Sequence, residues 1–186
     1  MNPIKNKKNL ETTIDDIRNF AYSYLEKYSP SKQQLRTYLF KKTVKLGQNI
    51  SSKKEIFNLI DSVITTLEDQ KFVSDKYYSD AKSKAFLRRG YSLNKINQSL
   101  RNKGIDIKYI KSSIDKIKDD EIEPDFVSAL KLCKRRRIGP LRPEANRELF
   151  YKKDMGILAR GGFSYDLSKR VLNLDEIEFN KLLKIV

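Results

Sequence analysis

The spacing of apolar residues is the feature that most constrains how this chain can fold. Apolar side chains recur at intervals of three and four residues, first in Ile17, Phe20, Ala21, Tyr24 and Leu25. This spacing places side chains on one face of a helix, where they can be buried together. It recurs along the whole 186-residue sequence, and no segment shows the two-residue alternation of a strand. The sequence therefore predicts an all-α fold.

Capping residues and helix breakers predict where these helices begin and end. Ser52 and Glu55 have the spacing of a capping box, and Pro124 suits the first position of a helix. Gly139 with Pro140 is expected to break a helix. Helices are expected to open at Thr13, Ser31, Ser52, Ser74, Ser92, Asp106, Pro124, Glu144, Ser164 and Asp175. In the helix expected between Ser74 and Gly90, the inward residues are Tyr78, Ala81 and Ala85.

A degenerate internal repeat organises these helices. Leu35 and Leu39 follow Ser31 by four and eight residues, and Ile96 and Leu100 follow Ser92 in the same way. The segments RRGYS (residues 88–92) and RGGFS (residues 160–164) also align. We expect a basic tail over residues 1–12 and helical repeats over residues 13–49, 50–105 and 106–186. The acidic run from Asp119 to Glu123 is the expected linker.

The charge of the chain points to an anionic partner. Lys and Arg number 39 against 24 acidic residues, which gives a net charge of +15; such an excess is typical of proteins that bind polyanions. No apolar run approaches the roughly 20 residues of a membrane span, and the N-terminus lacks the apolar core of a signal peptide. The single cysteine, Cys133, suits a reducing compartment. The expected protein is cytoplasmic and contacts no membrane.

Two clusters of cations are the candidate binding residues. The denser cluster comprises Lys134, Arg135, Arg136, Arg137 and Arg142, and the second comprises Arg88, Arg89, Lys95, Arg101 and Lys103, with Arg160 at the matching repeat position. Clustered cations bind phosphates because they release condensed counterions. The alternative is a solvated surface, and Arg88 and Arg89 also suit a helix C-terminus, where cations complement the helix dipole.

Catalysis is not expected. The chain has no histidine, the commonest general base and zinc ligand, and it contains no phosphate-binding GxxxxGK[ST] segment. The acidic run lies along one linker, whereas metal-binding carboxylates converge from separate elements. We therefore expect no metal and no cofactor. Cys133, Tyr78, Phe86, Phe150 and Phe163 suit a core, whereas Tyr38, Tyr77 and Tyr165 are candidates for surface aromatics.

Three blocks of the sequence carry a resemblance to a known family. The first covers residues 24–42 (YLEKYSPSKQQLRTYLFKK), the second residues 67–105 with RRGYS, and the third residues 134–142 (KRRRIGPLR) with residues 157–172 (ILARGGFSYDLSKRVL). In these blocks the chain resembles the RecX family of RecA regulators. The family commonly has glycine where Lys71 stands, paired acids at Ser74 and Asp75, and often a second arginine where Gly161 stands.

The resemblance implies a fold and a function. It implies an elongated, curved array of three tandem three-helix repeats. It also implies a monomeric, non-enzymatic protein of DNA repair and the SOS response. Such a protein binds RecA filaments on single-stranded DNA and restrains filament growth, ATP hydrolysis and strand exchange. The alternative is a plain nucleic-acid-binding protein of helix-turn-helix-like units without a RecA partner.

Overall fold

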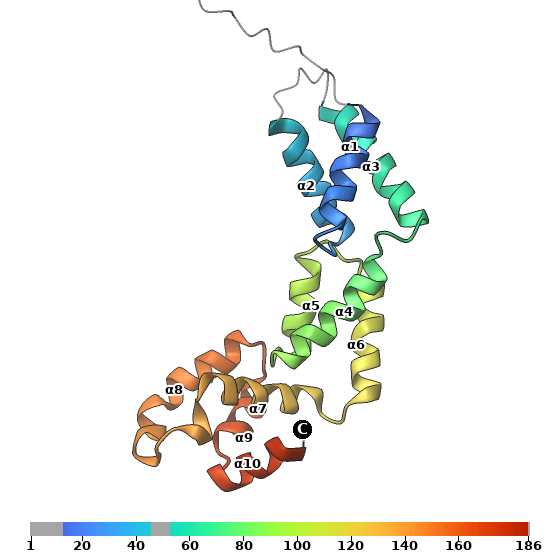
Figure 1. The fold of residues 1–186 in the computed structure, drawn as a ribbon. Coiled ribbons are helices and arrows are strands. Elements are labelled where there is room, and N and C mark those ends of the chain that lie inside the picture. The colour runs from blue at the N-terminus through green and yellow to red at the C-terminus, as the bar shows by residue number, and fades with distance from the viewer. Residues whose placement is uncertain (1–12, 46–52, 186) are drawn as a thin grey trace, which may run out of the picture. The chain divides into compact units, whose positions relative to one another are not determined.

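The structure is a computed structural model that describes residues 13–45 and 53–185. All regular elements in these ranges are helical, which confirms the all-α prediction (Figure 1). In chain order they are α1 (Ile14–Leu25), α2 (Lys32–Lys45), α3 (Lys53–Asp69), α4 (Asp75–Arg88), α5 (Leu93–Arg101), α6 (Ile107–Asp120), α7 (Pro124–Arg136), the 3₁₀ turn η1 (Gly139–Leu141), α8 (Glu144–Arg160), α9 (Tyr165–Leu172) and α10 (Glu176–Ile185). The chain divides into two compact units, residues 1–78 and 79–186.

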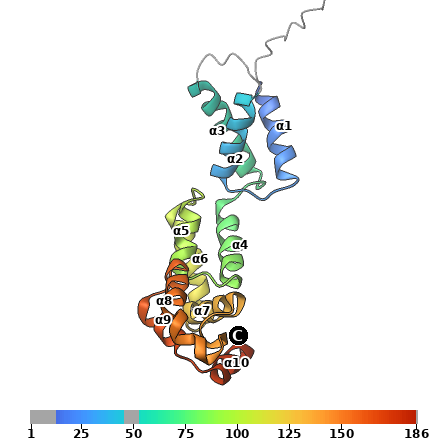
Figure 2. The same cartoon turned by 90° about the vertical axis from the view of Figure 1, so that its left-hand side faces the viewer.

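The first unit is built around α1, α2 and α3, which lie side by side in both ribbon views (Figures 1 and 2). Ile17, Leu35 and Ile60, one from each helix, are fully buried in a shared core. The packing therefore groups α3 with the two helices before it, whereas the expected division after residue 49 placed it in the second repeat. That division into three repeats stays a prediction.

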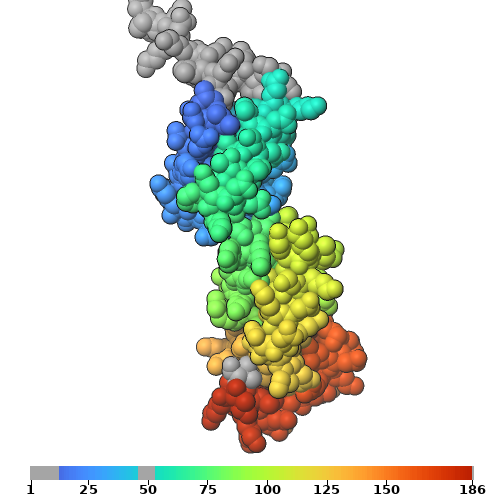
Figure 3. Space-filling model, turned by 90° about the vertical axis from the view of Figure 1, so that its right-hand side faces the viewer, coloured from blue at the N-terminus to red at the C-terminus, as the bar shows by residue number. Residues whose placement is uncertain are grey.

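The second unit contains most of α4 and all helices that follow. The apolar faces of α5 and α6 pack together through buried Ile96, Leu100 and Ile110. Farther along the chain, α7, α8, α9 and α10 enclose a core that includes Leu130, Leu158 and Phe179. The outer face of α6 is exposed, and Figure 3 shows this helix in yellow at the surface.

Local hydrogen bonds at the helix starts confirm several predicted caps. Thr13 and Asp16 form a reciprocal capping box at α1, as Ser31 and Gln34 do at α2. The hydroxyls of Ser92 and Ser164 accept the third backbone N–H of α5 and α9. A side-chain acceptor at this position satisfies an amide that the helix leaves without a partner. The predicted box at Ser52 lies outside the described residues.

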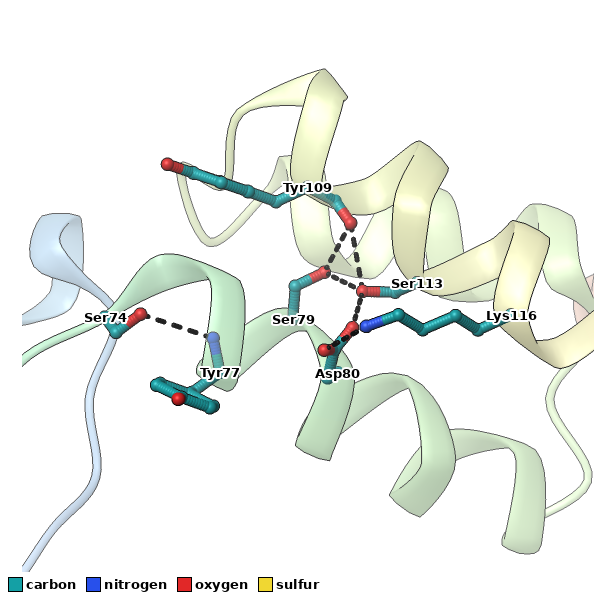
Figure 4. Close-up of polar contacts among 7 residues, drawn as sticks. All are labelled: Ser74, Tyr77, Ser79, Asp80, Tyr109, Ser113 and Lys116. Atoms are coloured by element: carbon teal, nitrogen blue, oxygen red, sulfur yellow. Dashed lines mark hydrogen bonds and ion pairs between the residues drawn. The ribbon is translucent and has the colours of Figure 1, made fainter.

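The predicted inward face of α4 was right for Tyr78, which is buried, and wrong for the two alanines. Ala81 is exposed and Ala85 is only half-buried, whereas Ser79, Ser83 and Leu87 are buried. The short serines let α4 and α6 approach closely: the Ser79 and Ser113 hydroxyls lie 2.8 Å apart (Figure 4). Apolar periodicity missed this face because it includes buried serines, of which Ser79 finds hydrogen-bond partners on α6 whereas the Ser83 hydroxyl has none among the described residues.

The connections between helices differ in two places from the sequence pattern. Asp119 and Asp120 belong to the last turn of α6, so the linker is shorter than the acidic run. At its end Glu123 adopts a left-handed conformation, and its carboxylate pairs with Arg170 at 2.9 Å. Lys71, where the RecX family commonly has glycine, also has a positive φ of 63°. That conformation favours glycine.

Cys133 is fully buried in the core of the second unit, as the sequence predicts. Burial, together with the negative charge of Asp154, raises the pKa of its thiol to about 12. Since thiolate is the reactive form and an ordinary cysteine has a pKa of about 8.5, the thiolate fraction at pH 8 falls by roughly three powers of ten. We expect a thiol reagent to modify native protein on the order of a thousandfold more slowly than urea-unfolded protein. Labelling at equal rates would contradict this burial.

Candidate anion-binding groove

Two adjoining hollows in the second unit bring together cations from three helices. The first hollow, of about 410 Å³, is lined by Gly90, Tyr91, Lys95, Leu132, Arg135, Arg136, Ile157, Arg160 and Gly161. The second, of about 730 Å³, is lined by Asn94, Lys95, Asn97, Gln98, Arg101, Ala159, Arg160 and Gly162. Because Lys95 and Arg160 line both, we treat the two hollows as one feature, the basic groove.

The helices position the groove side chains through simple spacing. One face of α5 carries four groove residues, because Asn97, Gln98 and Arg101 follow Asn94 by three, four and seven residues. The end of α7 contributes Arg135 and Arg136, and the end of α8 contributes Arg160. Cations at a helix C-terminus also complement the helix dipole, so these positions are favourable before any ligand binds.

Glycines bring the walls of the groove close together. Gly90 ends the turn after α4 with a φ of +73°, and a Cβ there would lie 2.8 Å from the backbone nitrogen of Leu132 on α7. A Cβ on Gly162, at a φ of +87°, would collide with the Ser92 hydroxyl. That hydroxyl donates to the carbonyl of Gly161 at 2.8 Å. The distance between α5, α7 and α8 therefore depends on residues without side chains.

In each unit, an aspartate in the first turn of one helix accepts a hydrogen bond from the backbone N–H at the start of an earlier helix. In the first unit the Lys32 N–H donates to Asp75 at 2.9 Å. In the second unit the Leu93 N–H donates to Asp125 at 2.7 Å. Burial raises the pKa of Asp125, although this hydrogen bond and the charge of Lys118 oppose the rise. The repeated contact supports the internal repeat inferred from the serine caps.

No carboxylate among the described residues pairs with the groove cations. None of the ion pairs seen within residues 13–45 and 53–185 includes Lys95, Arg135 or Arg160. Two groove cations contact neutral amides instead: Lys95 Nζ lies 3.4 Å from Gln98 Oε1, and Arg101 Nε donates to Asn97 Oδ1 at 2.8 Å. Amides and unpaired cations are the donors that contact phosphates and bases in nucleic-acid complexes.

The structure brings together some of the predicted binding residues and not others. Five of them line the groove: Lys95, Arg101, Arg135, Arg136 and Arg160. Another five lie outside its lining: Arg88, Arg89, Lys103, Lys134 and Arg137. Arg88, Arg89, Lys134 and Arg137 are exposed, and Lys103 is half-buried. A binding role for these ten residues stays a prediction.

Arg142 occupies a different environment from the other predicted cations. Its guanidinium binds both carboxylate oxygens of Asp154 at 2.7 and 2.8 Å, and the Asp154 side chain is only 2% exposed. The same carboxylate accepts the Gly139 N–H at 3.0 Å, and Arg142 also lies over the Phe150 ring. These contacts hold η1 against α8, and a binding role for Arg142 stays a prediction.

Sequence reasoning missed the polar residues that complete the groove. Asn94, Asn97 and Gln98 carry no charge, and a search for cations passes over them. Their spacing relative to Arg101 was the available signal, since it puts the four side chains on one helical face. The Tyr91 ring stacks on Phe86, with centroids 5.2 Å apart, and it also lines the first hollow.

The described part of the chain contains neither a metal-binding cluster nor a membrane-spanning helix. Over residues 13–45 and 53–185, no group of three or more Asp, Glu, Cys or His residues has the geometry to hold a metal ion. Within the same ranges, no helix is both long enough and apolar enough to cross a bilayer. The basic groove is therefore the feature on which we base a functional interpretation.

The fold and the groove define an all-α helical-repeat protein with a basic groove whose cations have no carboxylate partner among the described residues. No protein-family model matches the chain, but curated relatives do. It is 26% identical to the regulatory protein RecX of Myxococcus xanthus, covering 84% of each chain, and 27% identical to that of Clostridioides difficile, covering 90% of this chain and 74% of the relative. A RecX from Agrobacterium fabrum is 23% identical and covers 89% of this chain and 86% of that one. These matches support the assignment of the chain to the RecX family.

Solved structures agree in fold. The crystal structure of RecX from Lactobacillus salivarius superimposes with a TM-score of 0.57 at 18% identity, covering 93% of this chain and 97% of that one. A second crystal structure of regulatory protein RecX gives the same TM-score at 20% identity, covering 87% of this chain and 74% of that one. The helical-repeat fold is thus shared, although most side chains differ.

Proposed function

We propose that this protein regulates the RecA recombinase by binding in the groove of RecA filaments on single-stranded DNA. The observation that carries the proposal is the basic groove, with cations from α5, α7 and α8 and no carboxylate partner among the described residues. The RecX relatives, all named as regulatory proteins, support RecA as the partner. A filament is a dense polyanion, and the net charge of +15 favours association with it.

The proposed mechanism is steric and needs no chemistry from this chain. A protein held in the filament groove occupies the space that an incoming duplex requires, and it resists the rearrangement of RecA subunits. Filament growth, ATP hydrolysis by RecA and strand exchange are then all reduced. The chain itself acts by binding and not by catalysis.

The test neutralises the groove while leaving the core intact. In the variant Arg135→Ala/Arg136→Ala/Arg160→Ala, we expect filament affinity to fall roughly 10- to 100-fold, and the slope of log affinity against log salt to decrease by about 3, because each lost phosphate contact lowers it by about 1. Inhibition of the RecA ATPase should weaken in parallel. Binding and ATPase assays over a salt series measure both quantities.

A matched control removes the same charge elsewhere in the second unit. Lys84, Lys111 and Lys181 are exposed on α4, α6 and α10 and lie outside the groove lining. Their triple alanine variant should keep most of the affinity and inhibition. Equal losses in the two variants would show that net charge matters and the groove does not. If the original chain does not inhibit RecA, and the groove variant loses binding to naked DNA, the plain nucleic-acid-binding alternative is favoured.

A further inference from the structure

An apolar hollow lies between α8 and α9, beside the basic groove. It has a volume of about 460 Å³ and is lined by Tyr151, Lys152, Met155, Gly156, Ala159, Phe163, Tyr165 and Ser168. Tyr165 is 66% exposed although it forms part of the lining. We call this hollow the tyrosine slot. Its walls are aromatic rings and a thioether, which provide flat apolar surface and few polar atoms.

The tyrosine slot adjoins the cations of the groove. Ala159 lines both the slot and the α5 side of the basic groove, and the next residue, Arg160, lines both groove hollows. One surface therefore offers unpaired positive charge and, directly beside it, apolar space next to an exposed aromatic ring. A ligand that fills both parts needs an anionic backbone and a flat apolar group attached to it.

The fold does not require the small residue at the centre of the slot. Gly156 lies inside α8, where glycine is less favourable than any ordinary residue except proline. A Cβ at this position would meet only Arg160 Nη1, at 3.5 Å, which is an ordinary contact. Packing therefore leaves room for a larger side chain, and the glycine has the effect of keeping the slot open.

We propose that the tyrosine slot receives an unstacked base of single-stranded nucleic acid, with the neighbouring phosphates on Lys95 and Arg160. Aromatic side chains beside a cationic groove are the usual means of binding single strands, because every base has a face that can stack. Duplex bases are paired and stacked on one another, so they cannot enter without being flipped out. The inference extends the proposed function, since it supposes that the basic groove receives phosphates.

Binding to naked oligothymidylate tests the slot without RecA. We expect Tyr165→Ala to weaken binding roughly 5- to 100-fold, which is the range for loss of one stacked base, whereas Tyr165→Phe should bind as the original chain does. Strands whose sugars carry no bases should bind the original chain weakly. Tyr165→Ala should bind these baseless strands and normal strands with nearly equal affinity. Fluorescence anisotropy measures all five affinities.

A second pair of variants tests the same space from the opposite wall. Gly156→Leu places a large side chain in the slot without straining α8, so it should weaken binding to oligothymidylate, whereas Gly156→Ala should not. The proposal is overturned if normal and baseless strands bind equally. It is also overturned if Gly156→Leu weakens binding to RecA filaments but not to naked strands, because a protein side chain would then occupy the slot.

The two proposals can fail separately. If the naked-strand results are as expected but no groove variant changes RecA inhibition, the slot is supported and the regulatory proposal is wrong. If groove variants abolish RecA inhibition while all slot variants bind oligothymidylate normally, the base-binding proposal is wrong and the regulatory one stands.

Discussion

Replacing Arg142 with alanine is expected to lower the free energy of unfolding by on the order of 3–5 kcal/mol, the usual cost of leaving one partner of a buried ion pair alone. Asp154 is 2% exposed in its side chain and would lose both guanidinium hydrogen bonds, keeping only the Gly139 N–H. The free energy of unfolding of Arg142→Lys should fall between those of the original chain and Arg142→Ala. An ammonium keeps the charge but cannot bind both carboxylate oxygens in the same way. Urea unfolding followed by circular dichroism measures these differences.

Arg170→Ala is the matched control, because the Arg170–Glu123 pair is more than half exposed on both sides. Exposed pairs contribute at most about 1 kcal/mol, so this variant should unfold close to the original chain. A loss below about 1 kcal/mol for Arg142→Ala as well would contradict the buried pair. One practical consequence concerns interface experiments: a variant that neutralises Arg142 together with the groove arginines loses function through instability, and Arg142 should be left in place.

Gly90→Ala is expected to destabilise the second unit by roughly 2–4 kcal/mol, combining an unfavourable positive φ with overpacking. The added Cβ would lie 2.8 Å from both Leu132 N and Ser128 O, which are backbone atoms of α7 and cannot rotate away. Moving α7 to relieve the contact displaces Arg135 and Arg136, so filament binding should weaken as well. Urea unfolding and the filament-binding assay together measure the two effects.

The control for Gly90→Ala is Gly156→Ala in α8. Gly156 has helical neighbours and no positive φ, and a Cβ there would meet only Arg160 Nη1, at 3.5 Å. Alanine there should raise the free energy of unfolding by up to about 1 kcal/mol, because glycine disfavours a helix interior. If both substitutions have the same sign, the close approach of the Gly90 turn to α7 does not limit stability, and the explanation offered for the glycine is wrong.

Much of the local structure could be predicted from the sequence. The caps at Thr13, Ser92 and Ser164, the helix start at Pro124 and the buried positions of Ile96 and Leu100 all follow from contacts within a few residues. Helices are determined by neighbours three and four positions away, which a sequence displays directly. The resemblance to RecX was also carried by short segments, and the comparisons confirmed it.

The sequence by itself therefore determined the all-α class, most helix starts and the excess of positive charge. Only the tertiary structure decided which cations share a surface. Lys95 and Arg160, which are distant in sequence, line the same hollow beside the Ser92–Gly161 hydrogen bond. Arg142 follows Arg136 closely in sequence but is bound by Asp154. It also decided that serines, not alanines, face inward on α4. The physical reason is that these outcomes depend on contacts between residues distant in the chain, and helical periodicity carries no information about which distant side chain completes a polar contact.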